Sequence, residues 1–231
     1  MRLLALDTST EACSAALFQD GAITLRFEIT ERSHADLILP MVESLLGEAG
    51  IALADLDGLA FGRGPGGFTG LRIATGVVQG LALGAGLPVA PVSSLAAVAE
   101  QVPAGEGEAI LVCNDARMGE LYWGVFRKAA NGSLEALAPE SVSPPERVAI
   151  DAAIVRHAAG NGIPRYLELR ARLQAAGLQL HDNLYPRADA VARLGAIELA
   201  AGRAVSAEMA LPTYVRDDVA RPAGPTVTGM S

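Results

Sequence analysis

The chain has 231 residues, of which 51% are hydrophobic and 19% charged, and its formal net charge is −8. This composition allows a sizeable buried core and excludes a largely disordered chain. The acidic balance argues against a protein that grips nucleic acid alone, because phosphate contacts require a basic surface. An acidic chain can still serve a nucleic-acid pathway when a partner supplies that surface.

The N-terminal segment predicts a strand followed by a hairpin. Asp20-Gly21 is a typical two-residue turn, and it lies between two apolar stretches. The predicted strands are RLLALDT, CSAALFQ and AITLRFEIT, over residues 2–8, 13–19 and 22–30.

A helix is predicted over residues 33–50, with Ser33 as its N-cap. Helical spacing places Leu37, Met41 and Leu45 on one face. The unit continues with a strand over 56–62, a helix over about 69–83, an extended piece over 87–93 and a helix over 95–101.

The same order of elements then restarts. Residues 108–137 predict a strand, a second strand and a hairpin with an Asn131-Gly132 turn. Asp115 ends the first strand of this unit, as Asp7 ends that of the N-terminal unit. The repeated order indicates a duplication, although sequence identity between the units is negligible. The second unit is shorter, with a strand over 152–160 and helices over 164–177 and 188–204.

Two α/β units that each open with a hairpin predict the fold class. We expect a duplicated actin-like, sugar-kinase-like (ASKHA) fold with two ribonuclease-H-like subdomains, the second reduced. The predicted subdomains cover residues 1–105 and 106–219. Residues 220–231 are rich in Pro, Gly and Thr, and we expect them to be a disordered tail.

Residues 61–84, FGRGPGGFTGLRIATGVVQGLALG, hold eight of the 25 glycines. A glycine-rich loop before a helix is a common phosphate site. A P-loop, however, requires a lysine after Gly67, where Phe68 stands. The G-x-G-x-x-G spacing of residues 62–67 also lacks the acidic residue expected about 20 positions later. Both phosphate-binding interpretations are therefore disfavoured.

Gly76, Gly80 and Gly84 recur every fourth residue, so they form a stripe on one helix face beside Val77. Each glycine costs a helix about 1 kcal/mol relative to alanine. Such a stripe indicates close packing, and two interpretations remain open: the helix meets its own sheet, or it meets a partner helix.

Several other features predict where the protein is located in the cell and that it has no metal site. Residues 73–99 are uncharged, but Pro88 and Pro91 favour two buried elements over a membrane span. The thiols Cys13 and Cys113 are far apart and no signal peptide is recognised, so we expect a cytoplasmic protein without membrane contact. The three histidines are scattered, and no metal site is expected.

Two turns are candidates for nucleotide binding. Asp7 and Asp115 end strands where an actin-like ATPase would hold Mg²⁺ or phosphate, and both also suit turn capping. Gly160 and Gly162 flank Asn161 in a segment that suits either an adenosine or a tight turn, and we favour the turn.

Taken in order, seven motifs resemble the bacterial TsaB (YeaZ) family over nearly the whole chain. They are LALDTST, SHADLILPMVESLLGEAG, LDGLAFGRGPGGFTGLRIATGVVQGLA, PVSSLAAVAE, NDARMGELYWGVF, AGNG and LPTYVRDDVA. The resemblance implies the actin-like fold and a place in the complex that forms N6-threonylcarbamoyladenosine at position 37 of tRNAs reading ANN codons. In that family the paralogue TsaD holds the catalytic site, the ATPase TsaE completes the complex, and another enzyme supplies threonylcarbamoyl-AMP.

The resemblance also indicates which paralogue this is. Ser94 and Val98 stand where TsaD has the two histidines of its metal-binding H-x-x-x-H motif, and valine cannot bind a metal. The superfamily phosphate turn D-x-G-T reads Asp7-Thr8-Ser9-Thr10, so Ser9 replaces the glycine. The turn at Asp115 lacks its glycine as well.

We therefore expect a non-catalytic scaffold and activator, a homodimer alone and a heterodimer with TsaD. The expected interface comprises the glycine stripe with Val77 and the face of Leu37, Met41 and Leu45. Asp7, Ser9, Thr10, Asp115, Gly160 and Gly162 would form a vestigial nucleotide site. We expect no tightly bound cofactor, ATP or ADP being confined to the complex interface, and contact with tRNA only through the complex. An ATP-dependent small-molecule kinase and a metallopeptidase are the alternatives.

Overall fold

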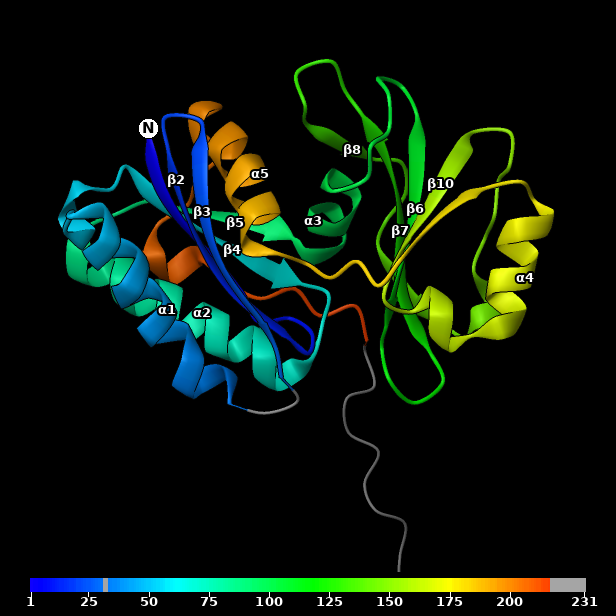
Figure 1. Cartoon of the computed structure of the whole chain (residues 1–231), viewed down its shortest axis with the longest axis horizontal. Coiled ribbons are helices and arrows are strands. Elements are labelled where there is room, and N and C mark those ends of the chain that lie inside the picture. The colour runs from blue at the N-terminus through cyan, green and yellow to red at the C-terminus, as the bar shows by residue number, and fades with distance from the viewer. Residues whose placement is uncertain (31–32, 217–231) are drawn as a thin grey trace, which may run out of the picture.

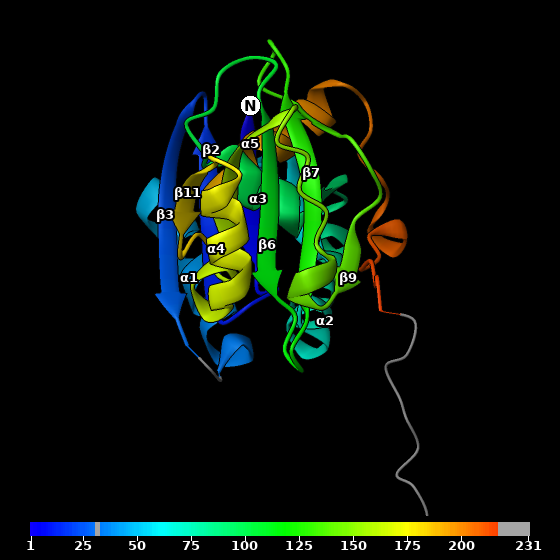
Figure 2. The same ribbon diagram turned by 90° about the vertical axis from the view of Figure 1, so that its right-hand side faces the viewer.

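The computed structural model describes residues 1–30 and 33–216. Two β-sheets stand side by side, and helices lie on both sides of the first sheet (Figure 1). α1 and α2 cover its outer face, whereas α3 and α5 lie between the two sheets. α4 covers the outer face of the second sheet (Figure 2).

The first sheet has five strands in the order β3-β2-β1-β4-β5. β1 pairs antiparallel with β2 and parallel with β4, so the central strand joins a hairpin to a parallel unit. The strands are β1 (Arg2–Asp7), β2 (Ala12–Gln19), β3 (Ala22–Ile29), β4 (Gly58–Gly64) and β5 (Val89–Ser93). The helices of this part of the chain are α1 (His34–Ala49), α2 (Phe68–Ala85) and α3 (Ser94–Glu100).

The second sheet repeats this topology, with the order β11-β10-β6-β7-β8 and β9 added on β7. β6 again pairs antiparallel with the next strand and parallel with β10. The predicted duplicated actin-like fold is therefore confirmed. The strands are β6 (Ala109–Asp115), β7 (Leu121–Lys128), β8 (Leu134–Ala136), β9 (Ser141–Ser143), β10 (Val155–Gly160) and β11 (Gln179–Asp182), and the helices are α4 (Leu167–Ala175) and α5 (Ala188–Ala200).

The second unit is smaller because the stretch between its hairpin and β10 holds only the short strand β9 and a 3-10 turn, η2 (Pro145–Arg147), where the first unit has α1. Further 3-10 turns are η1 (Leu53–Asp55), η3 (Ile163–Arg165) and η4 (Ala207–Met209). No described helix is long and apolar enough to cross a bilayer.

α5 corrects one part of the predicted domain division. We assigned it to the subdomain of residues 106–219, but it packs against β1, β2, β4 and β5 of the first sheet. The close approach depends on Gly195, where an added Cβ would lie 2.5 Å from the Cβ of Ala60. The chain therefore returns to the first sheet after β11, and the boundary near residue 105 stays a prediction. The predicted tail over 220–231 lies outside the described residues.

Small and branched side chains fill the space between the sheets. The buried cluster there joins Leu3 and Ala5 of the first sheet, Val98 of α3, Val191 of α5 and Ile110 of the second sheet. Because one apolar cluster contains both sheets and both intervening helices, the two halves share a core. The hydrophobic effect, about 25 cal/mol per Å² of buried apolar area, thus holds the halves together as well as folding each.

α1 begins at His34, as predicted to within one residue, but its N-terminus differs in detail from the expectation. Ser33 has φ +90°, and its side chain makes no capping hydrogen bond. The helix ends at Ala49, and Gly50 after it has the left-handed φ of +65° that is usual at helix C-termini. The core-facing side chains of α1 are Ile38, Val42 and Leu45.

Candidate functional site: two turns at the junction of the halves

The first turn follows β1 and encloses the carboxylate of Asp7, which is fully buried. Oδ1 of Asp7 accepts hydrogen bonds from the backbone N–H of Ser9 at 2.8 Å and from its hydroxyl at 2.7 Å. The hydroxyl of Ser94 lies 3.4 Å from Oδ2. Desolvation raises the pKa of Asp7 to about 6 despite these hydrogen bonds. The serine that replaces the superfamily glycine therefore satisfies the carboxylate within the chain itself.

The glycine-rich loop packs against this same turn. A Cβ added at Gly62 would lie 1.7 Å from Oδ2 of Asp7, and one at Gly70 would lie 1.9 Å from the backbone oxygen of Thr8. Two hydrogen bonds of 2.7 Å join the surfaces, from Gly67 N–H to Ser9 O and from Thr8 Oγ1 to Gly70 O. These glycines permit contact between two segments of backbone, which explains the loop without a phosphate.

The second turn carries a cluster of opposite charges. The guanidinium of Arg165 lies 3.1 Å from Glu11 and 3.5 Å from Asp115, and that of Arg117 lies 3.9 and 3.7 Å from the same two carboxylates. Glu11 and Asp115 are almost buried, with 11% and 5% of their side chains exposed. Because Glu11 belongs to the first half and Arg165 to the second, these ion pairs also join the halves.

At the second turn, a residue other than glycine adopts a backbone conformation that favours glycine. Arg117 has φ +62°, in the left-handed region that favours glycine. Its backbone N–H donates to Oδ1 of Asp115 at 3.1 Å, and the hydroxyl of Tyr166 donates to the same atom at 3.2 Å. Asp115 thus caps its own turn, as the second of the two sequence interpretations proposed.

The glycines after β10 serve close packing. Gly160 has φ +126°, and an added Cβ would lie 2.3 Å from the backbone oxygen of Cys113. Gly162 donates its N–H to that oxygen at 3.0 Å, while Asn161 accepts from the N–H of Asp115 at 3.0 Å. These contacts fit the tight turn that the sequence favoured.

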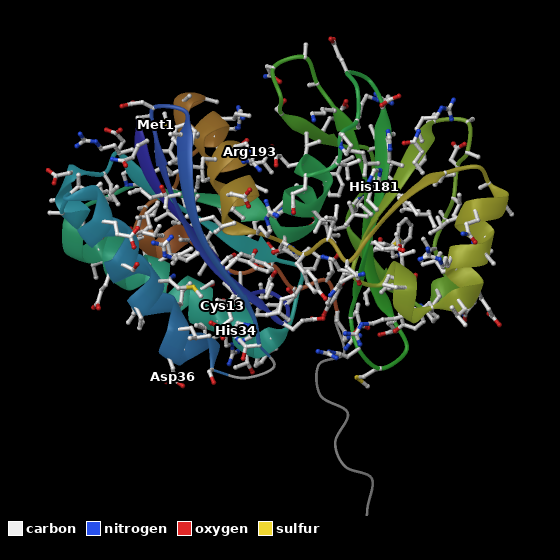
Figure 3. All side chains as sticks on the ribbon, in the orientation of Figure 1. Met1, Cys13, His34, Asp36, His181 and Arg193 are labelled. Atoms are coloured by element: carbon white, nitrogen blue, oxygen red, sulfur yellow. The ribbon has the colours of Figure 1, made fainter. Side chains whose placement is uncertain are left out.

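A cavity of about 580 Å³ lies between the two turns. Thr10 of the candidate nucleotide site lines it, and its hydroxyl accepts from the N–H of Ala12 at 3.2 Å. His34 and Asp36, which Figure 3 labels at the start of α1, line it as well. Asp36, Glu11 and Asp115 outnumber the single arginine of the lining, Arg117, and this charge balance is unfavourable for a polyphosphate.

The glycine stripe faces away from the sheet. Gly76, Gly80 and Gly84 are exposed, and a Cβ added at any of them would meet no atom within 4 Å. The core-facing side of α2 is formed instead by Ala74, Val78 and Ala82. The interpretation that the stripe packs on its own sheet is therefore wrong, and a partner remains the open alternative.

The other predicted interface residues differ in exposure. Leu37 and Met41 of α1 and Val77 of α2 are partly buried and pack against the outer core. Leu45 is only 1% exposed, so it belongs to the core of this chain and offers no surface to a partner. Side chains four positions apart on a helix are offset by about 40° around its axis. Leu45 is therefore offset by about 80° from Leu37, and this offset turns its side chain towards the first sheet.

Sequence reasoning missed one histidine pair. His157 on β10 and His181 on β11 have ring nitrogens 3.1 Å apart, and Nε2 of His157 lies 3.2 Å from Glu108. Burial and the neighbouring His157 lower the pKa of His181. Only the pairing of the two strands brings these residues together. Within residues 1–30 and 33–216, no group of three or more His, Cys, Asp or Glu side chains could hold a metal.

The raised pKa of Asp7 predicts a pH dependence. The folded state holds this proton up to about pH 6, whereas the unfolded chain releases it near pH 4. Its contribution to the free energy of unfolding is therefore full below pH 4 and is lost as the pH rises through 6, a change of about 3 kcal/mol. Asp7→Asn mimics the protonated acid and removes this titration.

Urea unfolding at several pH values between 4 and 7 measures the difference between wild type and the Asp7→Asn variant. We expect the stability of wild type relative to the variant to fall across that range. Equal pH profiles for the two proteins would show that Asp7 titrates normally.

Fold and site together define a duplicated actin-like protein in which the chain's own side chains occupy both candidate nucleotide turns. A family model described as TsaD, tRNA N6-adenosine threonylcarbamoyltransferase, matches residues 27–220. The tRNA threonylcarbamoyladenosine biosynthesis protein TsaB of Escherichia coli K12 is 40% identical over 230 residues, covering 95% of this chain and 96% of the relative.

Solved structures agree with the sequence comparison. YeaZ from Pseudomonas aeruginosa is 44% identical with a TM-score of 0.81, covering 92% of this chain and 99% of that protein. A Pseudomonas aeruginosa protein described as similar to peptidase YEAZ is 45% identical with a TM-score of 0.82, covering 93% and 99% of the two chains. The chain belongs to the TsaB (YeaZ) family.

Proposed function

We propose that this chain is a non-catalytic subunit of the complex that forms N6-threonylcarbamoyladenosine at position 37 of tRNAs reading ANN codons. In this proposal it binds the catalytic paralogue TsaD and activates it. The observation that carries the proposal is the open glycine stripe on α2. Three glycines weaken the helix by about 1 kcal/mol each, and no contact within the described chain requires them.

A partner helix packed on the stripe would explain why the chain keeps three glycines that destabilise α2. With only hydrogen at Gly76, Gly80 and Gly84, another backbone can approach α2 at short distance, and Leu83 beside the stripe is 77% exposed and available for burial. One such face serves one partner at a time. The homodimer of the isolated chain and the heterodimer with TsaD would therefore compete for it.

The two turns support the non-catalytic role. Asp7 is enclosed by Ser9 and the glycine-rich loop, and Asp115 is held by Tyr166 and two arginines. A nucleotide would have to break these contacts before it met a phosphate-binding backbone. We therefore propose no tight nucleotide binding by the chain alone, with ATP or ADP bound only where it meets TsaD.

The remaining partners follow from the same proposal. TsaE would join the assembly, and tRNA would be held mainly by the other subunits, because a chain with net charge −8 provides a poor phosphate surface. The tRNA modification would take place in the cytoplasm.

Reconstitution tests the proposal. TsaD, TsaE, unmodified tRNA, ATP and threonylcarbamoyl-AMP are combined with and without this chain, and modified nucleoside is quantified. We expect product formation to require the chain. Formation at the full rate in its absence would contradict the proposal.

A further inference from the structure

A second cavity, of about 390 Å³, lies between the halves, and none of its lining residues also lines the cavity at the turns. It is formed by the C-terminal ends of β4 and β5, by α3 and α5, and by β7 with the segment from β8 towards β9. In α/β sheets the carboxyl ends of the strands are where ligands commonly bind. Its apolar walls are Pro91, Val92, Phe126, Leu134, Leu194 and Ile197.

Three charged side chains line this cavity. Glu198 of α5 is already paired with Arg203, at 2.7 and 2.8 Å, which leaves Arg63 from the first half and Glu140 from the second. Arg63, at the end of β4, donates to the hydroxyl of Thr213 at 2.6 Å. Glu140, between β8 and β9, accepts a hydrogen bond from the hydroxyl of Ser93. Burial raises the pKa of Glu140, and the hydrogen bond from Ser93 and attraction to Arg63 partly oppose that effect. Arg63 and Glu140 thus line the same cavity from opposite halves.

They nevertheless form no ion pair. Among the described residues, no carboxylate lies within 4.0 Å of the guanidinium of Arg63, whereas most other partly buried charges at the junction of the halves are paired. Partly desolvated charges are costly unless they meet a partner. A ligand that carries both charges would satisfy Arg63 and Glu140 together.

We propose that this cavity binds a small zwitterion with an apolar side chain, a free α-amino acid. Arg63 receives the carboxylate, Glu140 receives the ammonium group, and the side chain packs against the apolar wall. The volume is near the lower end of the range of about 300–1,000 Å³ for ligand pockets, which suits one amino acid. A purely apolar ligand would leave both charges unpaired, and a simple anion would be repelled by Glu140.

Binding would also couple the halves, because Arg63 belongs to the first and Glu140 to the second. A ligand that requires both sides stabilises the folded arrangement by mass action, so the midpoint of thermal unfolding rises with ligand concentration. This site goes beyond the proposed function, and it is tested on the isolated chain without TsaD or tRNA.

The test uses calorimetry and thermal unfolding with L-leucine, L-isoleucine, L-valine, L-methionine and L-phenylalanine as probes. We expect saturable binding of at least one of them. Two analogues of the best probe each lack one charge: the amide lacks the carboxylate, and the deaminated acid lacks the ammonium group. Each should bind at least about tenfold more weakly, a loss of about 1.4 kcal/mol, because each analogue lacks one hydrogen-bonded charge.

Two variants and a control complete the test. Glu140→Gln keeps the oxygen that accepts from Ser93 and removes only the charge, while Arg63→Gln keeps a donor for Thr213. Both should lose at least about tenfold in affinity. Glu135→Gln, on β8 but outside the cavity lining, should bind as wild type does.

Three results would overturn the proposal. They are no saturable binding of any of the five amino acids, equal binding of the best probe and its two analogues, and wild-type affinity in both cavity variants. Thermal unfolding of each variant establishes that it is folded, and either variant alone suffices if the other is not. Failure here would leave the reconstitution result unaffected.

Discussion

Replacing Gly80 with leucine should weaken binding of TsaD at least about a hundredfold while the isolated chain stays folded. The new side chain projects into open space, since no atom lies within 4 Å of a Cβ at this position. Leucine is also a better helix former than glycine by close to 1 kcal/mol. In the complex, the same side chain would hold the partner helix away from α2, and overpacking on that scale is strongly unfavourable.

Calorimetry of the purified chain with TsaD gives the affinity, and circular dichroism gives the fold. Ala171→Leu is the matched control, because Ala171 is exposed on α4, on the outer face of the second sheet (Figure 2). The control should bind TsaD as wild type does. Unchanged affinity in the Gly80 variant would place the interface elsewhere on the molecule.

A pair of alanine substitutions in α2 should separate the two groups of glycines. Gly70→Ala places a methyl group 1.9 Å from the backbone oxygen of Thr8. Because both sides of this contact are backbone, no side chain can move aside to relieve the clash. We expect a loss of about 3 kcal/mol in the free energy of unfolding. Gly76→Ala meets no atom within 4 Å and should gain up to about 1 kcal/mol.

The two variants carry the same chemical change in one helix, so their difference reports only the surroundings. That difference, about 4 kcal/mol, corresponds to roughly 10 °C in the midpoint of thermal unfolding for a domain of this size. Similar midpoints for the two proteins would mean that the β1–β2 turn does not pack tightly on the loop.

The sequence predicts much of the fold because its strongest patterns are local. Asp20-Gly21 and Asn131-Gly132 mark the hairpins directly, and the repeated order of elements gives the duplication. The spacing of Gly76, Gly80 and Gly84 fixes a common face, but spacing alone cannot tell whether that face meets a sheet or solvent. Only the neighbours of α2 in space decide this.

What the sequence missed depends on contacts between distant segments. α5 can pack on the first sheet only because Gly195 has no side chain where it meets Ala60. No local sequence pattern encodes this contact. Closure of the first turn joins Asp7 to Ser94, residues 87 positions apart. The Arg63 and Glu140 cavity likewise combines side chains from both halves. Such arrangements follow from tertiary packing, which overrides local preference.

In the proposed function, this chain activates a catalytic paralogue without performing the chemistry itself. The most direct measurement is the initial rate of threonylcarbamoyladenosine formation by a fixed amount of TsaD, with TsaE and excess substrates, as this chain is titrated. We expect a negligible rate without the chain, a rise that saturates near one chain per TsaD, and no rise with Gly80→Leu. A full rate in the absence of the chain, or full activation by that variant, would contradict it.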